Sequence, residues 1–335
     1  MEIVFTEWVS VTDASSVGET RRMAVAAAHR LGFDETLAGQ FALLATEASR
    51  NVLLHAGGGQ VVLAGVGHGS AAVARILAID KGTGIANIAD AMSDGFSTAG
   101  TMGGGLGAMK RIATNLDIFT GPNGTIVMIE LGKPPAKEAG QTRKPDVAGF
   151  AIPYPGERVC GDAWFCYQTP HRTVLLLADG LGHGWGASEA AEEAIATFRK
   201  RVELAPGEIL SYIHDALRKT RGAVGAVAEI RPAERLLIYA GVGNISGVVL
   251  DGNTSRSLVS HNGTLGMMSP KIQEFRSEWA PNSTLILHSD GLQSRWDLSS
   301  YSGLLSRHPA VIGGALLRDF RRQRDDVSVV VTKAA

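Results

Sequence analysis

The second half of the chain is organised around the stretch Val174-Leu175-Leu176-Leu177-Ala178-Asp179-Gly180-Leu181-Gly182-His183-Gly184. Its apolar run has the length of a buried strand and delivers one carboxylate, that of Asp179, to the end of the strand. The closely spaced glycines that follow let the backbone turn tightly around whatever this carboxylate holds. Such an arrangement is typical of a site for Mg²⁺ or Mn²⁺, because these cations prefer oxygen ligands.

One carboxylate cannot form such a site, and three further places in the sequence supply others. Asp162 lies beside an apolar stretch, Asp290 follows the apolar run 285–288, and Asp325 and Asp326 precede the strand-like run 327–331. A single Asp-Gly pair marks a turn more often than a site. The recurrence of carboxylates at predicted strand ends nevertheless favours one shared metal site.

Composition narrows the class of protein. The chain has 335 residues, 45% of them hydrophobic and 19% charged, and a formal net charge of −1. This length allows two domains, and the charge balance argues against nucleic acid or an anionic membrane surface as a partner. Cys160 and Cys166 are too few for a disulfide scaffold. Because no leader and no membrane-length apolar run is recognisable, we expect a cytoplasmic protein.

A change in composition separates the expected domains. The segment from Gly132 to about Pro145 reads GKPPAKEAGQTRKP, which is typical of a linker. We therefore expect an N-terminal domain at 1–133, a linker at 134–147 and a C-terminal domain at 148–335. Runs of strands with a few interposed helices favour an α+β fold in which stacked sheets are covered by helices.

Two helices are expected near the N-terminus. Ser16 and Glu19 form a capping-box pattern that predicts the start of the first helix, and Asp34 can cap the second. On the second helix Glu47 and Asn51 are four residues apart and therefore share a face. An Asn oxygen can ligate Mg²⁺, and a nearby carboxylate can accept a proton from a nucleophile.

The sequence that follows completes a predicted nucleotide site. Asp80, with Gly82 and Gly84 behind it, lies at the end of a predicted strand and can accept a hydrogen bond from an exocyclic amine such as that of adenine. A glycine run then leads into a helix, whose N-terminal amides suit phosphates. Each feature alone is common in surface helices and loops, but their order and spacing favour ATP. The run consists of Gly103, Gly104, Gly105, Leu106 and Gly107.

Residues 36–131 resemble the GHKL family, which has the Bergerat ATP-binding fold, and within it the anti-sigma-factor serine kinases of the RsbT and RsbW kind. The resemblance rests on 46–51 with 55–56, 80–84, 94–98 and 103–111. It implies an α/β sandwich in which Asn51 holds the Mg²⁺ of ATP and Glu47 acts as base toward a substrate serine. It further implies that Asp80 contacts adenine and that residues 103–107 surround the phosphates.

Residues 148–333 resemble the metal-dependent protein phosphatases (PPM), in the compact branch of RsbX and SpoIIE. The resemblance rests on 161–162, 179–184, 241–245, 262–263, 289–291 and 325–326. It implies an αββα sandwich with two Mg²⁺ or Mn²⁺ ions, which Asp162 and Asp179 bridge or flank and the Gly180 carbonyl helps to ligate. Asp290 completes the second ion site together with Asp325 or Asp326; the family pattern favours Asp325, with Asp326 behind it.

The two resemblances together imply opposing activities on one phosphorylation switch. The expected function is a metal-dependent serine/threonine phosphatase fused to an ATP-binding, serine-kinase-like domain. By resemblance, the partner is a phosphorylated STAS-domain protein, either an anti-sigma antagonist or a protein of the stressosome type. An alternative is that the N-terminal domain binds ATP or a partner only as a regulatory adaptor. A pseudo-phosphatase that only binds phosphoproteins is disfavoured, because all the acidic residues of the PPM pattern are present in the sequence.

Overall fold

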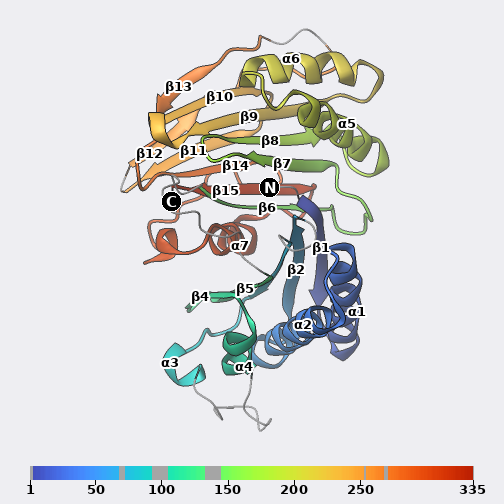
Figure 1. Cartoon of the computed structure of the whole chain (residues 1–335), viewed down its shortest axis with the longest axis vertical. Helices are drawn as coiled ribbons and strands as arrows, with labels where there is room; N and C mark the ends of the chain where they lie inside the picture. The colour runs from blue at the N-terminus through green and yellow to red at the C-terminus, as the bar shows by residue number, and fades with distance from the viewer. Residues whose placement is uncertain are drawn as a thin grey trace. The chain divides into compact units, whose positions relative to one another are not determined.

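The computed structural model describes residues 3–67, 72–92, 105–132, 145–252, 254–267 and 271–334. By its internal contacts the chain divides into two compact units (Figure 1). The N-terminal unit comprises the described residues within 2–137 and 306–318, and the C-terminal unit those within 138–305 and 319–335. Within the described ranges, no helix is both long enough and apolar enough to cross a membrane.

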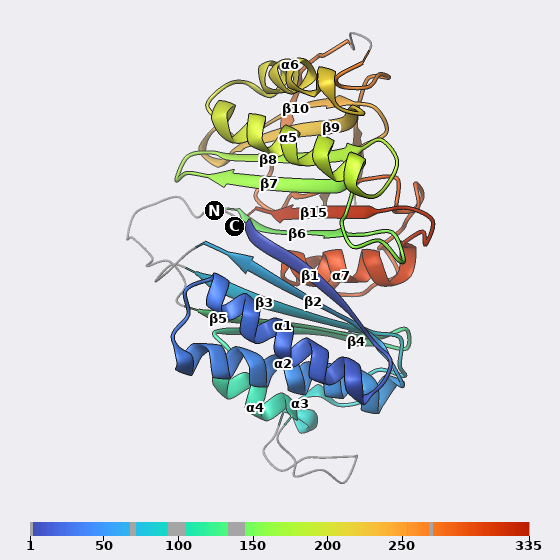
Figure 2. The ribbon, with the colours of Figure 1, turned by 90° about the vertical axis from the view of Figure 1, so that its right-hand side faces the viewer.

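The N-terminal unit is built on an antiparallel sheet of five strands in the order β1-β2-β3-β5-β4. Two long helices, α1 (Ala14–Arg30) and α2 (Glu35–Ala56), lie along one face of this sheet (Figure 2). The short helices α3 (Ile88–Ala91) and α4 (Gly105–Ile112) follow β3 in the chain. The strands are β1 (Ile3–Val11), β2 (Gly59–Val66), β3 (Val73–Asp80), β4 (Asn115–Gly121) and β5 (Gly124–Gly132).

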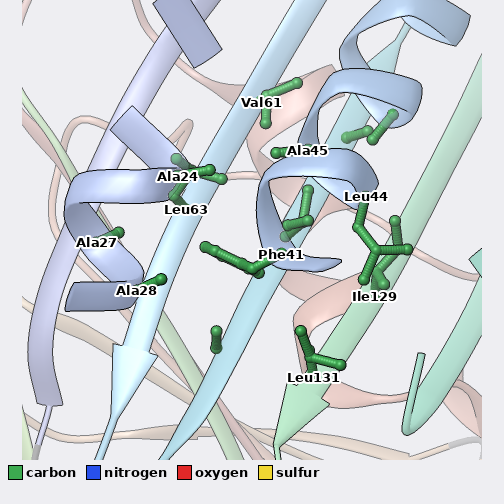
Figure 3. Packing of buried hydrophobic residues seen from close by; sticks show 14 of the residues in the cluster. Ala24, Ala27, Ala28, Phe41, Leu44, Ala45, Val61, Leu63, Ile129 and Leu131 are labelled. Carbon is green, nitrogen blue, oxygen red and sulfur yellow. The ribbon is translucent and has the colours of Figure 1, made fainter. Parts of the chain in front are cut away.

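Apolar side chains cover both faces of the central strands. On the helix-covered face, Phe41 and Leu44 of α2 pack with Leu63 and Ile129 of the sheet (Figure 3). The opposite face meets helix α7 (Pro309–Phe320): a Cβ on Gly314 would lie 3.1 Å from side-chain atoms of both Leu77 and Ile126. Strands that are apolar on both faces need cover on both faces. The helix therefore groups with this unit although it is distant in sequence.

The start of the first helix differs from the prediction, which placed the capping box at Ser16–Glu19. The N-cap is Asp13: its Oδ1 accepts a hydrogen bond from the Ser16 amide at 2.9 Å, and its own amide donates to Ser16 Oγ at 3.2 Å. Ser16 is therefore the third residue of the helix, because the Asp13 carboxylate competes for the same capping role. The predicted cap at Asp34 is confirmed, since its Oδ1 accepts from the Leu37 amide at 2.8 Å.

The C-terminal unit contains two five-stranded sheets, in the orders β13-β10-β9-β8-β7 and β12-β11-β14-β15-β6. Helices α5 (Trp185–Arg201) and α6 (Pro206–Ala216) pack on the first sheet through Phe198 and Ile213 (Figure 1). The expected α+β architecture is thus confirmed. The strands are β6 (Asp146–Ile152), β7 (Asp162–Gln168), β8 (Thr173–Gly180), β9 (Ala223–Arg231), β10 (Leu236–Val242), β11 (Ser246–Asp251), β12 (Thr254–Leu258), β13 (Phe275–Glu278), β14 (Thr284–His288) and β15 (Val327–Lys333).

Candidate functional sites

The N-terminal unit contains a cavity of about 920 Å³ beside α2, the end of β3 and α4. The predicted nucleotide-site residues that line it are Glu47, Asn51, Asp80, Gly82, Gly84, Gly105 and Leu106. Gly107 is buried within α4 and is not among the lining residues. Gly103 and Gly104 lie outside the described residues, as does the predicted motif at 94–98. The cavity is large enough for a nucleotide.

Asp80 is held in a fixed orientation at the end of β3. Its Oδ1 accepts hydrogen bonds from the Gly82 amide at 2.8 Å and from the Thr125 amide at 3.0 Å. Among the described residues, its Oδ2 has no hydrogen-bond donor. Gly84 has φ +80°, and a Cβ there would lie 2.3 Å from the Gly121 carbonyl oxygen, so only glycine fits this turn. The remaining carboxylate oxygen can therefore accept from a ligand amine.

Asn51 lies beside the start of α4. A Cβ on Gly105 would be 3.4 Å from Asn51 Oδ1, so a glycine at this position keeps the space between the amide and the helix open. Glu47 lies one helical turn before Asn51 on α2, and both side chains line the cavity. This geometry places a carboxylate and an amide oxygen at the same wall, as the predicted base and Mg²⁺ ligand require.

The C-terminal unit contains an acidic pocket of about 410 Å³, lined by the carboxylates of Asp179, Asp290 and Asp325. Asp179 belongs to β8 of one sheet, whereas Asp290 follows β14 and Asp325 precedes β15 of the other sheet. The predicted ligands thus converge because the ends of the two stacked sheets meet here, although Asp179 and Asp325 are 146 residues apart in the sequence. The other lining residues are Leu181, Gly182, Val224, Gly243, Asn244, Asn262 and Gly263.

Asp162 does not line this pocket but supports it from within the sheet. It pairs with Asp179 in the β7–β8 ladder, is only 5% exposed, and its Oδ2 accepts a hydrogen bond from Ser328 Oγ at 2.8 Å. Burial raises the pKa of Asp162 to about 7, although the Ser289 and Ser328 hydroxyls act in the opposite direction. Its carboxylate adds to the negative charge around Asp179.

The charges in the acidic pocket repel one another. Burial raises the pKa of Asp179 to about 9, and the negative charges of Asp162, Asp290 and Asp325 contribute in the same direction. Burial likewise raises the pKa of Asp325. Carboxylates gathered in this way are expected where cations neutralise them. The donor set therefore fits divalent metal ions.

Within the described ranges, no group of three or more His, Cys, Asp or Glu side chains is arranged to hold a metal ion by itself. The acidic pocket therefore brings Asp179, Asp290 and Asp325 to one cavity without closing them around a single ion. Gly180, at the end of β8 directly after Asp179, offers a backbone carbonyl as the further ligand that the sequence predicts.

Several supporting residues had no role assigned to them from the sequence. Asn244 donates from Nδ2 to Asp290 Oδ2 at 2.7 Å, and Ser328 binds Asp162. His183 lies 2.9 Å from Glu157 Oε1 through its Nδ1 and stacks on Tyr154 at 5.0 Å between ring centroids. The sequence indicated a turn at Gly243-Asn244 after a strand. It did not indicate that Asn244 contacts Asp290, which is 46 positions away.

The chain is similar to two known families. Residues 10–131 match the model described as a histidine kinase-like ATPase domain, and residues 169–335 match that of stage II sporulation protein E (SpoIIE). The serine/threonine-protein kinase RsbT of Bacillus subtilis (strain 168) is 34% identical over 109 residues, which cover 32% of this chain and 77% of RsbT. The phosphoserine phosphatase RsbX of the same organism is 28% identical over 144 residues, covering 41% of this chain and 69% of RsbX.

Two solved structures are similar to this chain over part of its length. A structure of RsbX in complex with magnesium aligns with a TM-score of 0.52 and 21% identity, covering 59% of this chain and 98% of that one. This likeness shows the fold. A chain from a study of the bacterial stressosome as a modular system that controls secondary messenger signalling aligns with a TM-score of 0.52 and 28% identity, covering 57% of this chain and all (100%) of that one.

Proposed function

Since the chain belongs to the RsbT kinase family in its N-terminal part and carries a SpoIIE-type PPM phosphatase domain, we propose that it sets the phosphorylation state of a STAS-domain regulator. The C-terminal unit would release phosphate from phosphoserine or phosphothreonine, and the N-terminal unit would bind ATP. The observation that carries this proposal is the convergence of Asp179, Asp290 and Asp325 on one pocket. RsbT and RsbX are named as a kinase and a phosphatase, and this chain resembles both.

The acidic pocket would hold two Mg²⁺ or Mn²⁺ ions. Asp179, Asp290 and Asp325 would be the carboxylate ligands and Gly180 would add its carbonyl, while Asp162 would contribute negative charge from β7. When bound, such ions neutralise charge on a phosphoryl group and acidify water. The chain's own residues fix the ligands, and Asn244 orients the Asp290 carboxylate through its hydrogen bond.

The phosphatase assignment is tested on the purified full chain with a phosphorylated STAS protein and Mn²⁺. We expect Asp179→Ala and Asp290→Ala to lower the rate of phosphate release by about 100-fold or more, since each removes a carboxylate from the pocket. Asp215→Ala is the matched control, because Asp215 is an exposed carboxylate that pairs with Arg218 and does not line the pocket. Equal rates in the parent and both pocket variants would contradict the assignment.

For the N-terminal unit we propose a kinase function in which Asn51 holds the Mg²⁺ of ATP and Glu47 accepts the proton of the substrate serine. Both side chains line the cavity that also contains Asp80. A carboxylate one helical turn from the proposed Mg²⁺ ligand supports this proposal over a purely regulatory, ATP-binding adaptor, which needs no base.

Radiolabelled ATP distinguishes the kinase from the adaptor. We expect label transfer to a STAS protein that disappears in Glu47→Ala and persists in Asp179→Ala, whose substitution lies in the other cavity. If label transfer persists in Asp179→Ala, the phosphatase site is not needed for it, and its loss in Glu47→Ala is assigned to the N-terminal cavity. Nucleotide binding by the parent without any label transfer would instead assign the unit as an adaptor.

A further inference from the structure

Arg221 lies beside the acidic pocket, in the turn before β9. Its Nη1 is 3.5 Å from the point where a Cβ of Gly182 would lie, and its Nε is only 2.5 Å from the corresponding point on Gly186. Gly182 lines the pocket, and the Leu181 amide donates to the Gly222 carbonyl at 3.1 Å. The glycines after Asp179 thus leave the space that the guanidinium occupies. Arg221 therefore lies against the glycine loop that borders the pocket, although it is not itself one of the residues that line the pocket.

The guanidinium of Arg221 has no ion-pair partner among the described residues, although Asp179, Asp290 and Asp325 line the adjacent pocket. The neighbouring Arg218 differs, because its Nη2 lies 2.9 Å from Asp215 Oδ1. An exposed arginine commonly pairs with a nearby carboxylate. A cation that stays unpaired beside an acidic pocket can instead contact an anion that enters the pocket.

Two residues with large, exposed apolar side chains adjoin glycines of this region, namely Gly186 and Gly222. Trp185 is 76% exposed and directly precedes Gly186, against which the guanidinium packs. Met267 is 60% exposed, and its Cγ is 3.4 Å from the Cβ position of Gly222, the residue after Arg221. Single exposed apolar residues are common, but aromatic, Met and Arg side chains grouped together are typical of protein-binding surfaces.

We propose that Arg221, Trp185 and Met267, here called the rim, bind the phosphoserine segment of a protein substrate. Arg221 contacts the phosphoryl oxygens, and Trp185 and Met267 contact the apolar side chains that flank the phosphoserine. This inference rests on the phosphatase function proposed above. A phosphoryl dianion that approaches three carboxylates needs positive charge, and the planar guanidinium can donate to two phosphate oxygens at once.

The rim is tested by kinetics on the full chain with Mn²⁺, using p-nitrophenyl phosphate and a short phosphoserine peptide that has leucine on both sides of the phosphoserine. Arg221→Gln is expected to raise KM for both substrates about ten-fold with little change in kcat. Trp185→Ala and Met267→Ala are expected to raise KM, roughly three-fold or more, for the peptide alone. Arg218→Gln is the control and should match the parent with both substrates.

A second variant moves the guanidinium without removing its charge. The new methyl group of Gly186→Ala would overlap Arg221 Nε and displace the side chain from the loop, so KM for both substrates should rise by a smaller factor than in Arg221→Gln. If Arg221→Gln raises KM for the peptide only, or for neither substrate, the assignment of Arg221 to the phosphoryl group is wrong.

Calorimetry supplies a readout that does not depend on turnover. In the presence of Mg²⁺, Arg221→Gln is expected to bind inorganic phosphate about ten-fold more weakly than the parent, with unchanged affinity for Mg²⁺. Equal phosphate affinities in the two proteins would overturn the proposal. If the parent hydrolyses neither substrate while its phosphate binding depends on Arg221, the phosphatase proposal fails and the anion contact stands.

Discussion

Asp162 and Asp179 occupy directly paired positions on the antiparallel strands β7 and β8. Two carboxylates at paired positions repel each other. Burial and the neighbouring carboxylates raise the pKa of Asp179 to about 9, which shows that its charged form is unfavourable when no cation is bound. Placing these two carboxylates side by side therefore destabilises the metal-free protein. We expect such a pair where a bound cation neutralises the charges.

Neutralising one of these carboxylates should stabilise the metal-free protein. In the presence of a chelator we expect Asp179→Asn to raise the free energy of unfolding by about 1 kcal/mol, because the repulsion is relieved. Mg²⁺ should raise the Tm of the parent and leave that of the variant nearly unchanged. Thermal unfolding with and without Mg²⁺ measures both effects. A variant that is less stable than the parent in chelator and gains equally from Mg²⁺ would contradict this account.

Asp325 and Asp326 are adjacent but face different surroundings. Asp325 lines the acidic pocket, whereas Asp326 is 2% exposed and accepts hydrogen bonds from the Tyr154 amide at 2.7 Å and the Gly161 amide at 2.9 Å. We expect Asp325→Asn to abolish Mn²⁺-dependent phosphate release with little change in Tm. Asp326→Asn should instead lower the free energy of unfolding by roughly 1–3 kcal/mol, because its amide nitrogen would face a backbone donor. Paired activity and melting measurements separate the two, and the reverse pattern would exchange their roles.

Nucleotide affinity should depend on Asp80. We expect Asp80→Asn to weaken ATP binding by roughly 10- to 100-fold, because an acceptor aimed into the cavity becomes partly a donor. Glu47→Gln should bind ATP like the parent, since its proposed task is proton transfer. Equilibrium binding of a fluorescent ATP analogue measures both. Unchanged affinity in Asp80→Asn would place the adenine elsewhere.

The contact of α7 with the N-terminal sheet should be sensitive to volume at Gly314. A Cβ there would already lie 3.1 Å from Leu77 and Ile126, so Gly314→Leu should overpack the interface and lower the free energy of unfolding by roughly 1–3 kcal/mol. The control is Gly39→Leu on α2, because no atom lies within 4 Å of the Cβ position of Gly39. Gly303→Leu is not a suitable control, because Gly303 has φ +76° and any side chain there would be strained. Denaturant unfolding of both variants gives the comparison. Equal stabilities would show that α7 packs loosely.

Glu130 predicts an acid-sensitive contribution to stability. Burial by itself would raise its pKa, but the positive charges of Arg75, whose Nη2 lies 2.6 Å away, and of His308 outweigh burial, and the pKa is lowered. A carboxyl with a lowered folded-state pKa stabilises the protein above its unfolded pKa of about 4.3 and loses this contribution as pH falls through the folded value. Glu130→Gln should therefore be less stable than the parent at pH 7.

The matching measurement is denaturant unfolding between about pH 5 and pH 3. Across this range the parent should lose more free energy of unfolding than Glu130→Gln, so the difference between them should shrink toward the acid end. Parallel curves for the two proteins would show that the Arg75 pair contributes equally in both protonation states.

Much of both sites could be predicted from local sequence. Asp80 and Asp179 lie at the end of an apolar strand and Asp290 follows one, and each precedes a glycine-containing turn, so this signal lies within a few residues of each carboxylate. The spacing of Glu47 and Asn51 predicted a shared helix face for the same reason, and the cavity confirms that both side chains line it. Local backbone geometry fixes such features, so a single sequence is enough to find them.

The other features depend on the folded chain. Neighbouring residues alone fix which strands are followed by carboxylates and which turns need glycine. Only the fold showed that Asp326 binds the backbone amides of Tyr154 and Gly161, that Arg221 lies along the glycine loop, and that α7 packs on a sheet from the other end of the chain. Each depends on contacts between residues distant in sequence, and it is the burial of apolar surface in the folded chain that brings them together.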